Sequence, residues 1–315
     1  MIDLIIPYYN NRIGLLNTLK SINQNIFKVT VIDDHSTEPP LFPLDAAQLL
    51  RLNINSGPGY ARQWGIDKTS NPYIMFLDTG DVFTSPEAQI GLEHIIAMNP
   101  DRNIISFPYY YKDEITKETD NRMHGKIYKR AFLEKYGITF AADSSYLNED
   151  IGFNRTCRYC TEAENIPILF FTLPIIEWIP NENSLTQKDN NISLYRDQTR
   201  ALSLVSIHTI ETLHKNNISD EEEINQIALY LYYWFIRTAA ERPEFMQEAW
   251  SGAKIFYDFY KNKIKPEQLV LGNAALKKSL QYRNQISFPI NILRFADDIW
   301  KSEIIPDKYL TENKI

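Results

Sequence analysis

Glycine and cysteine are both scarce in this sequence, and their scarcity argues against several classes of protein. Only 11 of the 315 residues are glycine and only 2 are cysteine. A disulfide-stabilised secreted domain would need more cysteines, in well-separated pairs. Cys157 and Cys160 stand alone, without a second Cys-x-x-Cys or a suitably spaced pair of histidines, so a zinc site has little support. We expect both on a helix that follows residues 148–150, in the reduced state.

Glycine-rich phosphate-binding motifs are also missing. The chain has neither the GxxxxGK[ST] loop of P-loop proteins nor the GxGxxG turn of dinucleotide-binding domains. Residues 55–59, Asn-Ser-Gly-Pro-Gly, lack the spacing and the lysine of both motifs. A sugar nucleotidyltransferase would have an early glycine-rich, basic loop, whereas Pro-Tyr-Tyr-Asn follows Ile6 here. Kinase, dehydrogenase and nucleotidyltransferase activities are therefore disfavoured.

Long hydrophobic runs are absent as well. A membrane-spanning helix needs about 18 or more consecutive apolar residues. The densest apolar run, residues 227–236, is too short and is followed by Arg237. The N-terminal residues lack the basic region and apolar core of a signal peptide. We therefore expect a cytoplasmic protein with no stable membrane insertion.

The charge is negative overall and uneven along the chain. The formal net charge is −7, which argues against coating nucleic acid or anionic membrane through bulk charge. Residues 251–315, in contrast, contain eleven Lys or Arg against seven Asp or Glu. This mildly basic segment is compatible with a polyanionic partner, and equally with a solvated helical surface.

The first half of the chain alternates short apolar runs with helical patterns. Residues 4–6 predict a buried strand that ends at Pro7, and residues 29–32 and 73–77 predict further strands. Such alternation predicts an α/β fold with a mostly parallel central sheet. In open parallel sheets, ligands bind beyond the carboxyl ends of the strands. Acidic residues occupy those positions here: Asp33, Asp34, Asp78 and Asp81.

The second half has a different character. Residues 200–215, 221–238 and 243–262 have helical periodicity, and strand patterns fade. We predict a first domain over residues 1–194 and an all-helical domain over residues 195–315. The helical domain is a plausible surface for a homodimer.

Carboxylates at strand ends suit a divalent cation that bridges a diphosphate. Mg²⁺ and Mn²⁺ prefer carboxylate and water oxygens, and phosphate oxygens complete the coordination. The acids at positions 78 and 81 are candidates for this role. The pattern therefore predicts a site for Mn²⁺ or Mg²⁺ together with a nucleoside diphosphate.

Seven segments, in order and at matching spacing, resemble the motifs of family 2 glycosyltransferases. They lie at residues 5–10, 31–36, 55–62, 76–81, 124–130, 148–153 and 183–186. The resemblance covers roughly residues 1–190 and implies the GT-A fold, the fold of nucleotide-diphospho-sugar transferases. It implies an enzyme that transfers a sugar from a nucleotide sugar, with a UDP-sugar as the expected donor, to an acceptor hydroxyl.

The resemblance also implies roles on the nucleotide side. Pro7 and Tyr9 would lie near the nucleobase, and Asp33 or Asp34 would hydrogen-bond the base or the ribose. Arg62 would lie near the donor, or form a salt bridge that fixes its loop.

The family commonly has Asp-x-Asp-Asp where this chain has Asp-Thr-Gly-Asp. Because Gly80 offers no side-chain ligand, Asp81 is the better candidate metal ligand. Asp78 would bind the ribose or the metal.

On the acceptor side, Asp150 matches the catalytic base of an inverting transfer, and Glu149 precedes it. His124 would line the sugar pocket or contact the diphosphate, or would serve only packing. The hydroxyl or cationic groups of Ser184, Lys126 and Arg130 would help to neutralise the departing diphosphate.

Three functions compatible with the resemblance remain open. The first is the synthesis of a surface polysaccharide or glycolipid. The second is a bacteriophage enzyme that glycosylates hydroxymethylated pyrimidine bases in DNA, in the cytoplasm of the host. The third is a non-catalytic module that binds sugar nucleotides, which the altered Asp-Thr-Gly-Asp would permit.

Overall fold

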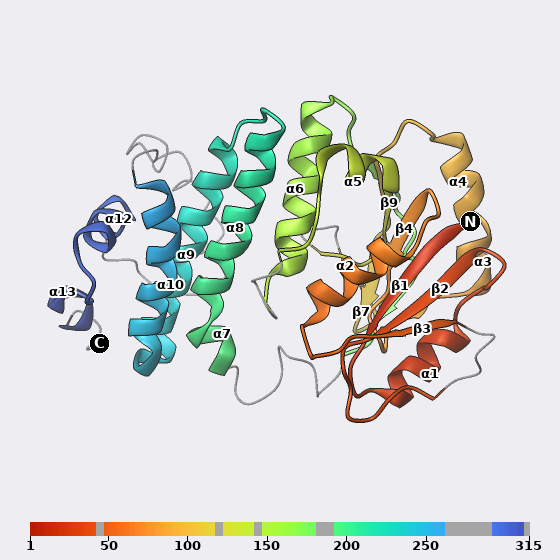
Figure 1. Cartoon of the computed structure of the whole chain (residues 1–315), viewed down its shortest axis with the longest axis horizontal. Coiled ribbons are helices and arrows are strands. Elements are labelled where there is room, and N and C mark those ends of the chain that lie inside the picture. The colour runs from red at the N-terminus through yellow and green to blue at the C-terminus, as the bar shows by residue number, and fades with distance from the viewer. Residues whose placement is uncertain (42–46, 117–121, 142–146, 181–191, 262–291, 312–315) are drawn as a thin grey trace. The chain divides into compact units, whose positions relative to one another are not determined.

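The computed structural model divides the chain into two compact units, residues 1–184 and 185–315 (Figure 1). It describes residues 1–41, 47–116, 122–141, 147–180, 192–261 and 292–311. The division falls among residues outside the described ranges, about ten positions before the domain boundary expected from the sequence. That boundary therefore stays a prediction. Each unit is described here by itself.

A seven-stranded sheet forms the centre of the first unit. In spatial order its strands are β10 (Leu169–Phe170), β6 (Ile104–Ser106), β9 (Lys126–Lys129), β4 (Tyr73–Phe76), β1 (Ile2–Tyr8), β2 (Phe27–Asp33) and β3 (Gln48–Arg51). Strand β9 is antiparallel to both of its neighbours, and the other neighbouring pairs are parallel. The prediction of a mostly parallel sheet is confirmed, and the antiparallel strand was not foreseen.

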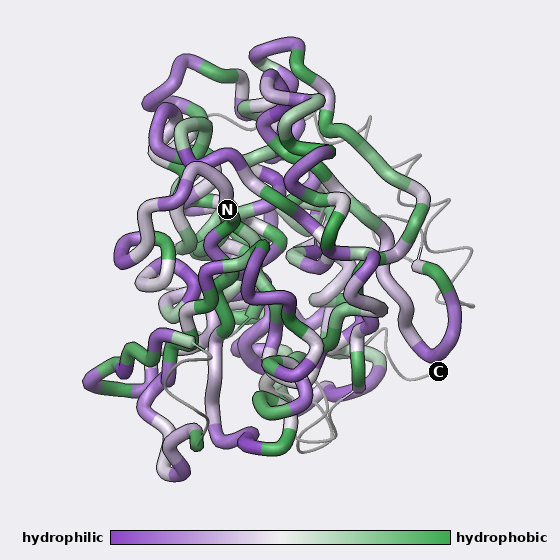
Figure 2. The backbone as a smooth tube through the Cα atoms, turned by 90° about the vertical axis from the view of Figure 1, so that its right-hand side faces the viewer, coloured by the Kyte–Doolittle hydropathy of each residue, from purple (hydrophilic) through white to green (hydrophobic). Residues whose placement is uncertain are grey.

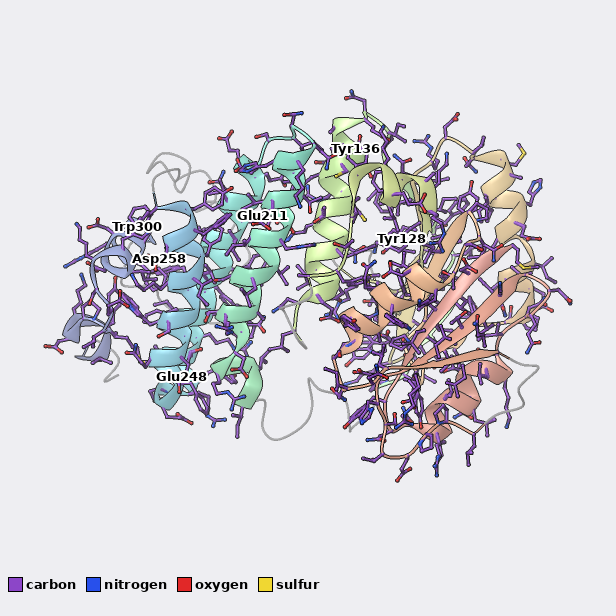
Figure 3. All side chains as sticks on the ribbon, viewed as in Figure 1. Tyr128, Tyr136, Glu211, Glu248, Asp258 and Trp300 are labelled. Atoms are coloured by element: carbon purple, nitrogen blue, oxygen red, sulfur yellow. The ribbon has the colours of Figure 1, made fainter. Side chains whose placement is uncertain are left out.

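A second, four-stranded sheet lies in the same unit. Its order is β5 (Val82–Phe83), β11 (Ile176–Trp178), β7 (Tyr109–Tyr111) and β8 (Glu114–Ile115). The helices of the unit are α1 (Arg12–Lys20), α2 (Pro58–Lys68), α3 (Pro86–Ile90), α4 (Leu92–Met98), α5 (Arg130–Tyr136) and α6 (Glu149–Ala163). Tyr128 on β9 lies on the side of the sheet next to α6, where its hydroxyl donates a hydrogen bond of 2.7 Å to Asn154 (Figure 3).

The first strand continues past the proline that we expected to end it. Strand β1 runs to Tyr8, with Pro7 opposite Ile32 of β2. The carbonyl of Ile5 accepts from Leu77 on the β4 side, and Pro7 faces the same side two residues later. Because β4 ends at Phe76, no strand needs the N–H that proline lacks.

The opposite end of the sheet contains a buried ion pair. The Arg130 guanidinium donates to the Asp3 carboxylate at 3.0 Å, to Thr69 Oγ1 at 2.7 Å, and to two backbone carbonyls. Asp3 lies at the amino end of β1, whereas the acids of the predicted site follow the carboxyl ends. The expectation that Arg130 assists the diphosphate is therefore wrong, because its guanidinium is paired with Asp3 at the opposite end of the sheet.

Both cysteines lie on α6, as expected. Cys157 and Cys160 are free thiols with no exposed surface. Burial raises the pKa of Cys157 well above its usual value. A thiol in this environment is neutral and unreactive.

The second unit is helical throughout its described part. Its helices are α7 (Ile192–Arg196), α8 (Gln198–Lys215), α9 (Glu221–Glu241), a 3₁₀ turn at Pro243–Phe245, α10 (Met246–Tyr260), α12 (Ile292–Lys301) and α13 (Asp307–Thr311). Buried aromatic rings form its core, including Phe235, Trp250 and Phe295. Trp300 on α12 donates its indole N–H to the Tyr257 carbonyl of α10 at 2.9 Å (Figure 3).

Among the described residues, none of the helices is both long enough and apolar enough to span a bilayer. Short hydrophobic stretches along the backbone are interrupted by hydrophilic ones (Figure 2).

Two glycines with left-handed backbones provide a matched test of the fold. Gly125 has φ +69°, and a Cβ there would meet the Phe107 carbonyl oxygen at 2.3 Å. Gly137 has φ +62° but open space around it. We expect Gly137→Ala to cost about 1–2 kcal/mol of stability, from the left-handed backbone alone. Gly125→Ala should cost clearly more, because the hydrogen bond of 2.9 Å from the Phe107 amide to the Gly125 carbonyl must also shift. Thermal unfolding of both variants measures the difference, and equal decreases in melting temperature would contradict the geometry.

Candidate active site

Two strand-end acids and a histidine come together beyond β4. One ligand atom from each of Asp78, Asp81 and His124 lies within 4.8 Å of the others. Asp81 is 2% exposed, and Asp78 and His124 are partly buried. His124 lies two residues before β9, the antiparallel strand beside β4. The mixed sheet thus brings residues 43 positions apart into one cluster.

A glycine turn directs Asp81 into the interior. Gly80 has φ +112°, a conformation that residues with side chains rarely adopt. Its amide donates to Thr18 Oγ1 at 2.9 Å, and the Asp81 amide donates to the Asp78 carbonyl at 3.0 Å. The Ile179 amide then donates to Asp81 Oδ1 at 3.0 Å. The departure from Asp-x-Asp-Asp is therefore a backbone requirement of this turn.

The arrangement of Asp81 and His124 fits a divalent metal. Asp81 Oδ2 lies 3.1 Å from His124 Nε2. Both atoms are buried, and neither has a hydrogen-bond partner of acceptable geometry among the described residues. Buried polar atoms are usually satisfied, so two that face each other without a hydrogen bond suit a shared ligand. Carboxylate oxygen and imidazole nitrogen are both ligands of divalent transition-metal ions such as Mn²⁺.

Burial and neighbouring charges set the protonation of the two acids in the absence of an ion. Burial raises the pKa of Asp81, and the adjacent His124 offsets only part of that rise. Burial also acts to raise the pKa of Asp78, but the Arg62 guanidinium and His124 outweigh it and bring the pKa below its usual value. Asp78 is therefore an anion in the folded chain.

A buried arginine links the cluster to the start of α6. Arg62 on α2 is 4% exposed. Its guanidinium donates to Asp78 at 2.6 Å and to Glu149 at 2.9 Å. A charge removed from water in this way requires paired carboxylates, and loss of one partner typically costs about 3–5 kcal/mol. Arg62 thus forms the salt bridge that was one of its two predicted roles.

The loop before α2 is shaped to admit this contact. Asp34 accepts hydrogen bonds from the Ser56 amide at 2.6 Å and the Gly57 amide at 2.8 Å. A Cβ on Gly59 would lie 2.7 Å from Cγ of Glu149. Only glycine lets α2 and α6 approach this closely, which explains the glycine at position 59.

The two predicted catalytic carboxylates have different environments at the N-terminus of α6. Glu149 is 7% exposed and bound to Arg62, whereas Asp150 is only partly buried. Asp150 Oδ1 accepts from the Ile151 amide at 2.8 Å. Burial raises the pKa of Asp150, and the Arg62 and Arg122 charges offset part of that rise. Of the two, Asp150 is the more exposed residue.

The residues predicted on the nucleotide side lie at the ends of β1 and β2. The Pro7 carbonyl accepts from Thr79 Oγ1 at 2.6 Å, and Tyr9 is about half exposed. Asp33 is fully buried and accepts from the Ser36 amide and the Arg51 guanidinium, each at 2.9 Å. Direct contact of these residues, or of Asp34, with a nucleotide stays a prediction.

The structure says little about Lys126 and Ser184, which were predicted to neutralise the departing diphosphate. Lys126 is 2% exposed, and its ammonium donates to the Arg122 carbonyl at 2.7 Å. That contact closes the turn between residues 122 and 126, and a direct role of Lys126 at the donor stays a prediction. Ser184, with the segment 183–186, lies outside the described residues.

Two arginines near the site were not identified from the sequence. The Arg51 guanidinium, partly exposed, is held by Asp33 and by the Ser36 carbonyl. Arg122 is exposed and lies with its guanidinium carbon 5.2 Å from the Trp178 ring. Neither stands in a motif, and only the folded chain shows which side chains they meet.

Comparisons with known proteins agree with this geometry. Residues 3–150 match the model of the family described as Glycosyl transferase family 2. An uncharacterized glycosyltransferase of Rickettsia bellii is 33% identical over 106 residues, which cover 29% of this chain and 14% of that protein. The teichoic acid poly(glycerol phosphate) polymerase of Staphylococcus epidermidis is 30% identical over 95 residues, 27% of this chain and 13% of that protein. The matches thus span only a small part of these relatives.

Solved structures share the fold. The crystal structure of S. aureus TarS residues 1–349 aligns with a TM-score of 0.53 at 13% identity, covering 92% of this chain and 94% of that one. Its complex with UDP gives 0.52 at 14% identity, with the same coverage. The prediction of a GT-A fold with a helical C-terminal region is confirmed. Over residues 3–150, the chain is similar to the family 2 glycosyltransferases.

Proposed function

We propose that the chain transfers a sugar from a nucleoside diphosphate sugar to an acceptor hydroxyl, with inversion at the anomeric carbon. One observation carries this proposal. The buried guanidinium of Arg62 binds Asp78, in the candidate metal cluster, and Glu149, the residue before the accessible carboxylate Asp150. The site proposed for the leaving diphosphate and the candidate base are thereby held at a fixed distance and orientation from each other.

Asp78, Asp81 and His124 would hold the divalent ion. When bound, that ion neutralises the charge that develops on the departing diphosphate. A nitrogen ligand in the set favours Mn²⁺ over Mg²⁺, since Mg²⁺ prefers oxygen ligands. Asp78 is already ionised by its contact with Arg62, so the cluster carries a negative charge ready for a cation.

Asp150 would act as the base. The second carboxylate oxygen of Asp150 takes the proton of the acceptor hydroxyl. The hydroxyl oxygen attacks the anomeric carbon at the same time, and the bond from the sugar to the diphosphate breaks. The hydrogen bond from the Ile151 amide fixes the other oxygen. Glu149, which was predicted beside it as a catalytic residue, is the positioning residue in this proposal because its carboxylate is bound to Arg62.

The comparisons guide the choice of substrates to test. The TarS structures include complexes with UDP and with UDP-GlcNAc, which supports uridine nucleotides as the first donors to examine. The similarity to a teichoic acid polymerase supports a surface polysaccharide or glycolipid as the acceptor. Among the described residues, nothing specifically favours modified DNA.

The proposal is tested by following donor consumption. The chain is incubated with Mn²⁺ and a panel of UDP-sugars, with a polysaccharide or glycolipid fraction as acceptor, and release of UDP is measured. NMR of the product gives its anomeric configuration. Release of UDP with an inverted linkage supports the proposal. Retention of configuration would contradict the role of Asp150, and binding without consumption would indicate a non-catalytic module.

Replacement of the candidate base should separate catalysis from binding. Asp150→Asn keeps the shape of the side chain but cannot accept the proton, so we expect kcat to fall about 10²–10⁴-fold. The affinity for the nucleoside diphosphate should change less than twofold. Asp101→Asn, an exposed acid elsewhere in the unit, is the matched control. Unchanged kcat in Asp150→Asn would show that another group takes the proton.

The pH dependence of kcat/KM should show the raised pKa of Asp150. A base works only when deprotonated, so the rate is present above its pKa and is lost as the pH falls through it. Because burial raises this pKa, the acid limb should lie above the usual range for aspartate, about 3.9. Arg122→Gln removes a charge that lowers the pKa, so the limb should move to higher pH. A limb near pH 4 that the variant does not move would contradict this assignment.

Binding of Mn²⁺ should depend on the inward carboxylate. Asp81→Asn removes the charge of a ligand that already has a hydrogen bond to Ile179, so the turn should survive. We expect Mn²⁺ affinity, measured from the free Mn²⁺ signal in electron paramagnetic resonance, to fall at least tenfold. Asp101→Asn should leave it unchanged. Equal Mn²⁺ binding by both variants would place the metal elsewhere.

A further inference from the structure

Aromatic rings line one face of the small sheet beside the metal cluster. Tyr109 and Tyr111 on β7 point to the same face because strand side chains alternate. Trp178 on β11 pairs in register with Tyr111, and their rings stack with centroids 4.4 Å apart at 24°. Tyr110 and Glu177 occupy the alternate positions.

This row of aromatic rings starts at His124, one of the three residues of the candidate metal site. The His124 ring lies 4.8 Å from the Tyr109 ring and 5.3 Å from the Trp178 ring. The residue after Trp178 is Ile179, whose amide donates to Asp81 at 3.0 Å. A group that lies on Trp178 is therefore close to the place where the sugar is transferred.

Two exposed cations border the stacked pair. The Arg122 guanidinium carbon lies 5.2 Å from the Trp178 ring centre, and the Lys112 ammonium lies 5.2 Å from the Tyr111 ring centre. Both side chains are exposed, and neither forms an ion pair with another described residue. Contacts between cations and aromatic faces are weak at exposed sites, so an anion can still bind both cations.

The Lys112 position depends on an unusual turn. Lys112 and Asp113 join β7 to β8 as a two-residue loop, with φ +50° and +64°. Such turns ordinarily use Asn-Gly, because left-handed backbone is unfavourable for other residues. A lysine here is held beside Tyr111 by the hairpin itself.

The segment that begins at Arg122 also contacts the helix of the candidate base. The following residue, Met123, has its sulfur 3.0 Å from the Asn154 side-chain amide, and that amide donates to the Asp150 carbonyl at 2.9 Å. The next residue is His124 of the metal cluster. The segment 122–124 therefore connects the N-terminus of α6 to the candidate metal site.

We propose that Trp178, Tyr111, Arg122 and Lys112 form an acceptor subsite for a sugar that carries a phosphate or carboxylate. The two cations would bind the anion, with Arg122 able to bind two oxygens at once. Their movement onto the anion would uncover the outer faces of the stacked Trp178–Tyr111 pair, which would then pack against the C–H face of the sugar ring. This inference rests on the proposed function. In the proposed function, Asp78, Asp81 and His124 serve the donor diphosphate. The segment that begins at Arg122 contacts the start of α6, where the proposed base lies, so we assign the anion to the acceptor.

The test uses glucose 6-phosphate as the anionic probe and glucose as its neutral partner. The intact chain is first saturated with UDP and Mn²⁺, which occupies the diphosphate site. Tryptophan fluorescence then reports the probe, because an anion that draws Arg122 away changes the surroundings of Trp178. We expect a saturable change with glucose 6-phosphate, and at least tenfold weaker binding of glucose.

The variants assign the effect to this subsite. Arg122→Gln and Lys112→Gln should each weaken glucose 6-phosphate binding at least fivefold, and Trp178→Phe should remove most of the signal. Lys68→Gln is the matched control, because the exposed Lys68 lies 4.7 Å from the Trp64 ring, another cation on an aromatic face in the same unit. It should change nothing.

Several outcomes would overturn the proposal. These are no saturable change in the wild-type chain, equal affinity for the two probes, or unchanged binding in Arg122→Gln. If Arg122→Gln instead weakens the binding of UDP with Mn²⁺, the cation serves the donor and the acceptor assignment is wrong. Binding of UDP in the first step, together with UDP-sugar consumption, reports on the proposed function separately. A chain that binds and consumes the donor but ignores glucose 6-phosphate loses only this subsite.

Discussion

The candidate site depends on the burial of one positive charge. Arg62 is sealed between α2, the end of β4 and the start of α6, and it binds a carboxylate from each of the last two. Taking a guanidinium out of water is unfavourable unless its partners are fixed and close. The strand end and the helix start are thereby held at a set separation. Asp78, to which we assign metal chemistry, is one end of this bridge, and Asp150, to which we assign base chemistry, follows Glu149 at the other end.

Several local features follow from that constraint. Gly59 has no side chain because Glu149 occupies the space, and Asp34 fixes the preceding loop through two backbone amides. Gly80 adopts a left-handed conformation that turns Asp81 inward to meet His124. Glycine is therefore needed at position 59 for close packing and at position 80 for its backbone conformation.

The sequence allowed much of the first unit to be predicted, for a physical reason. Buried parallel strands are short apolar runs, and polar residues directly after them must gather at one edge of the sheet, as Asp78 and Asp81 do. Contacts across strands were not predictable. The antiparallel placement of β9 brings His124 to Asp81 and carries Arg130 to the opposite edge, where Asp3 binds it. A motif gives the neighbours of a residue along the chain, whereas its role depends on the neighbours that the fold supplies.

The most direct measurement is the unfolding temperature of the intact chain with UDP, Mn²⁺, both together, and both with EDTA. A ligand that binds only the folded state stabilises it by about 2.7 kcal/mol at a hundredfold excess over its dissociation constant. A metal ion held by Asp78, Asp81 and His124 should strengthen nucleotide binding. The unfolding temperature should therefore rise when UDP and Mn²⁺ are both present, and should fall back to that of the ligand-free chain when EDTA is added. No rise with UDP or with any other nucleoside diphosphate would contradict a nucleotide-sugar site in this chain.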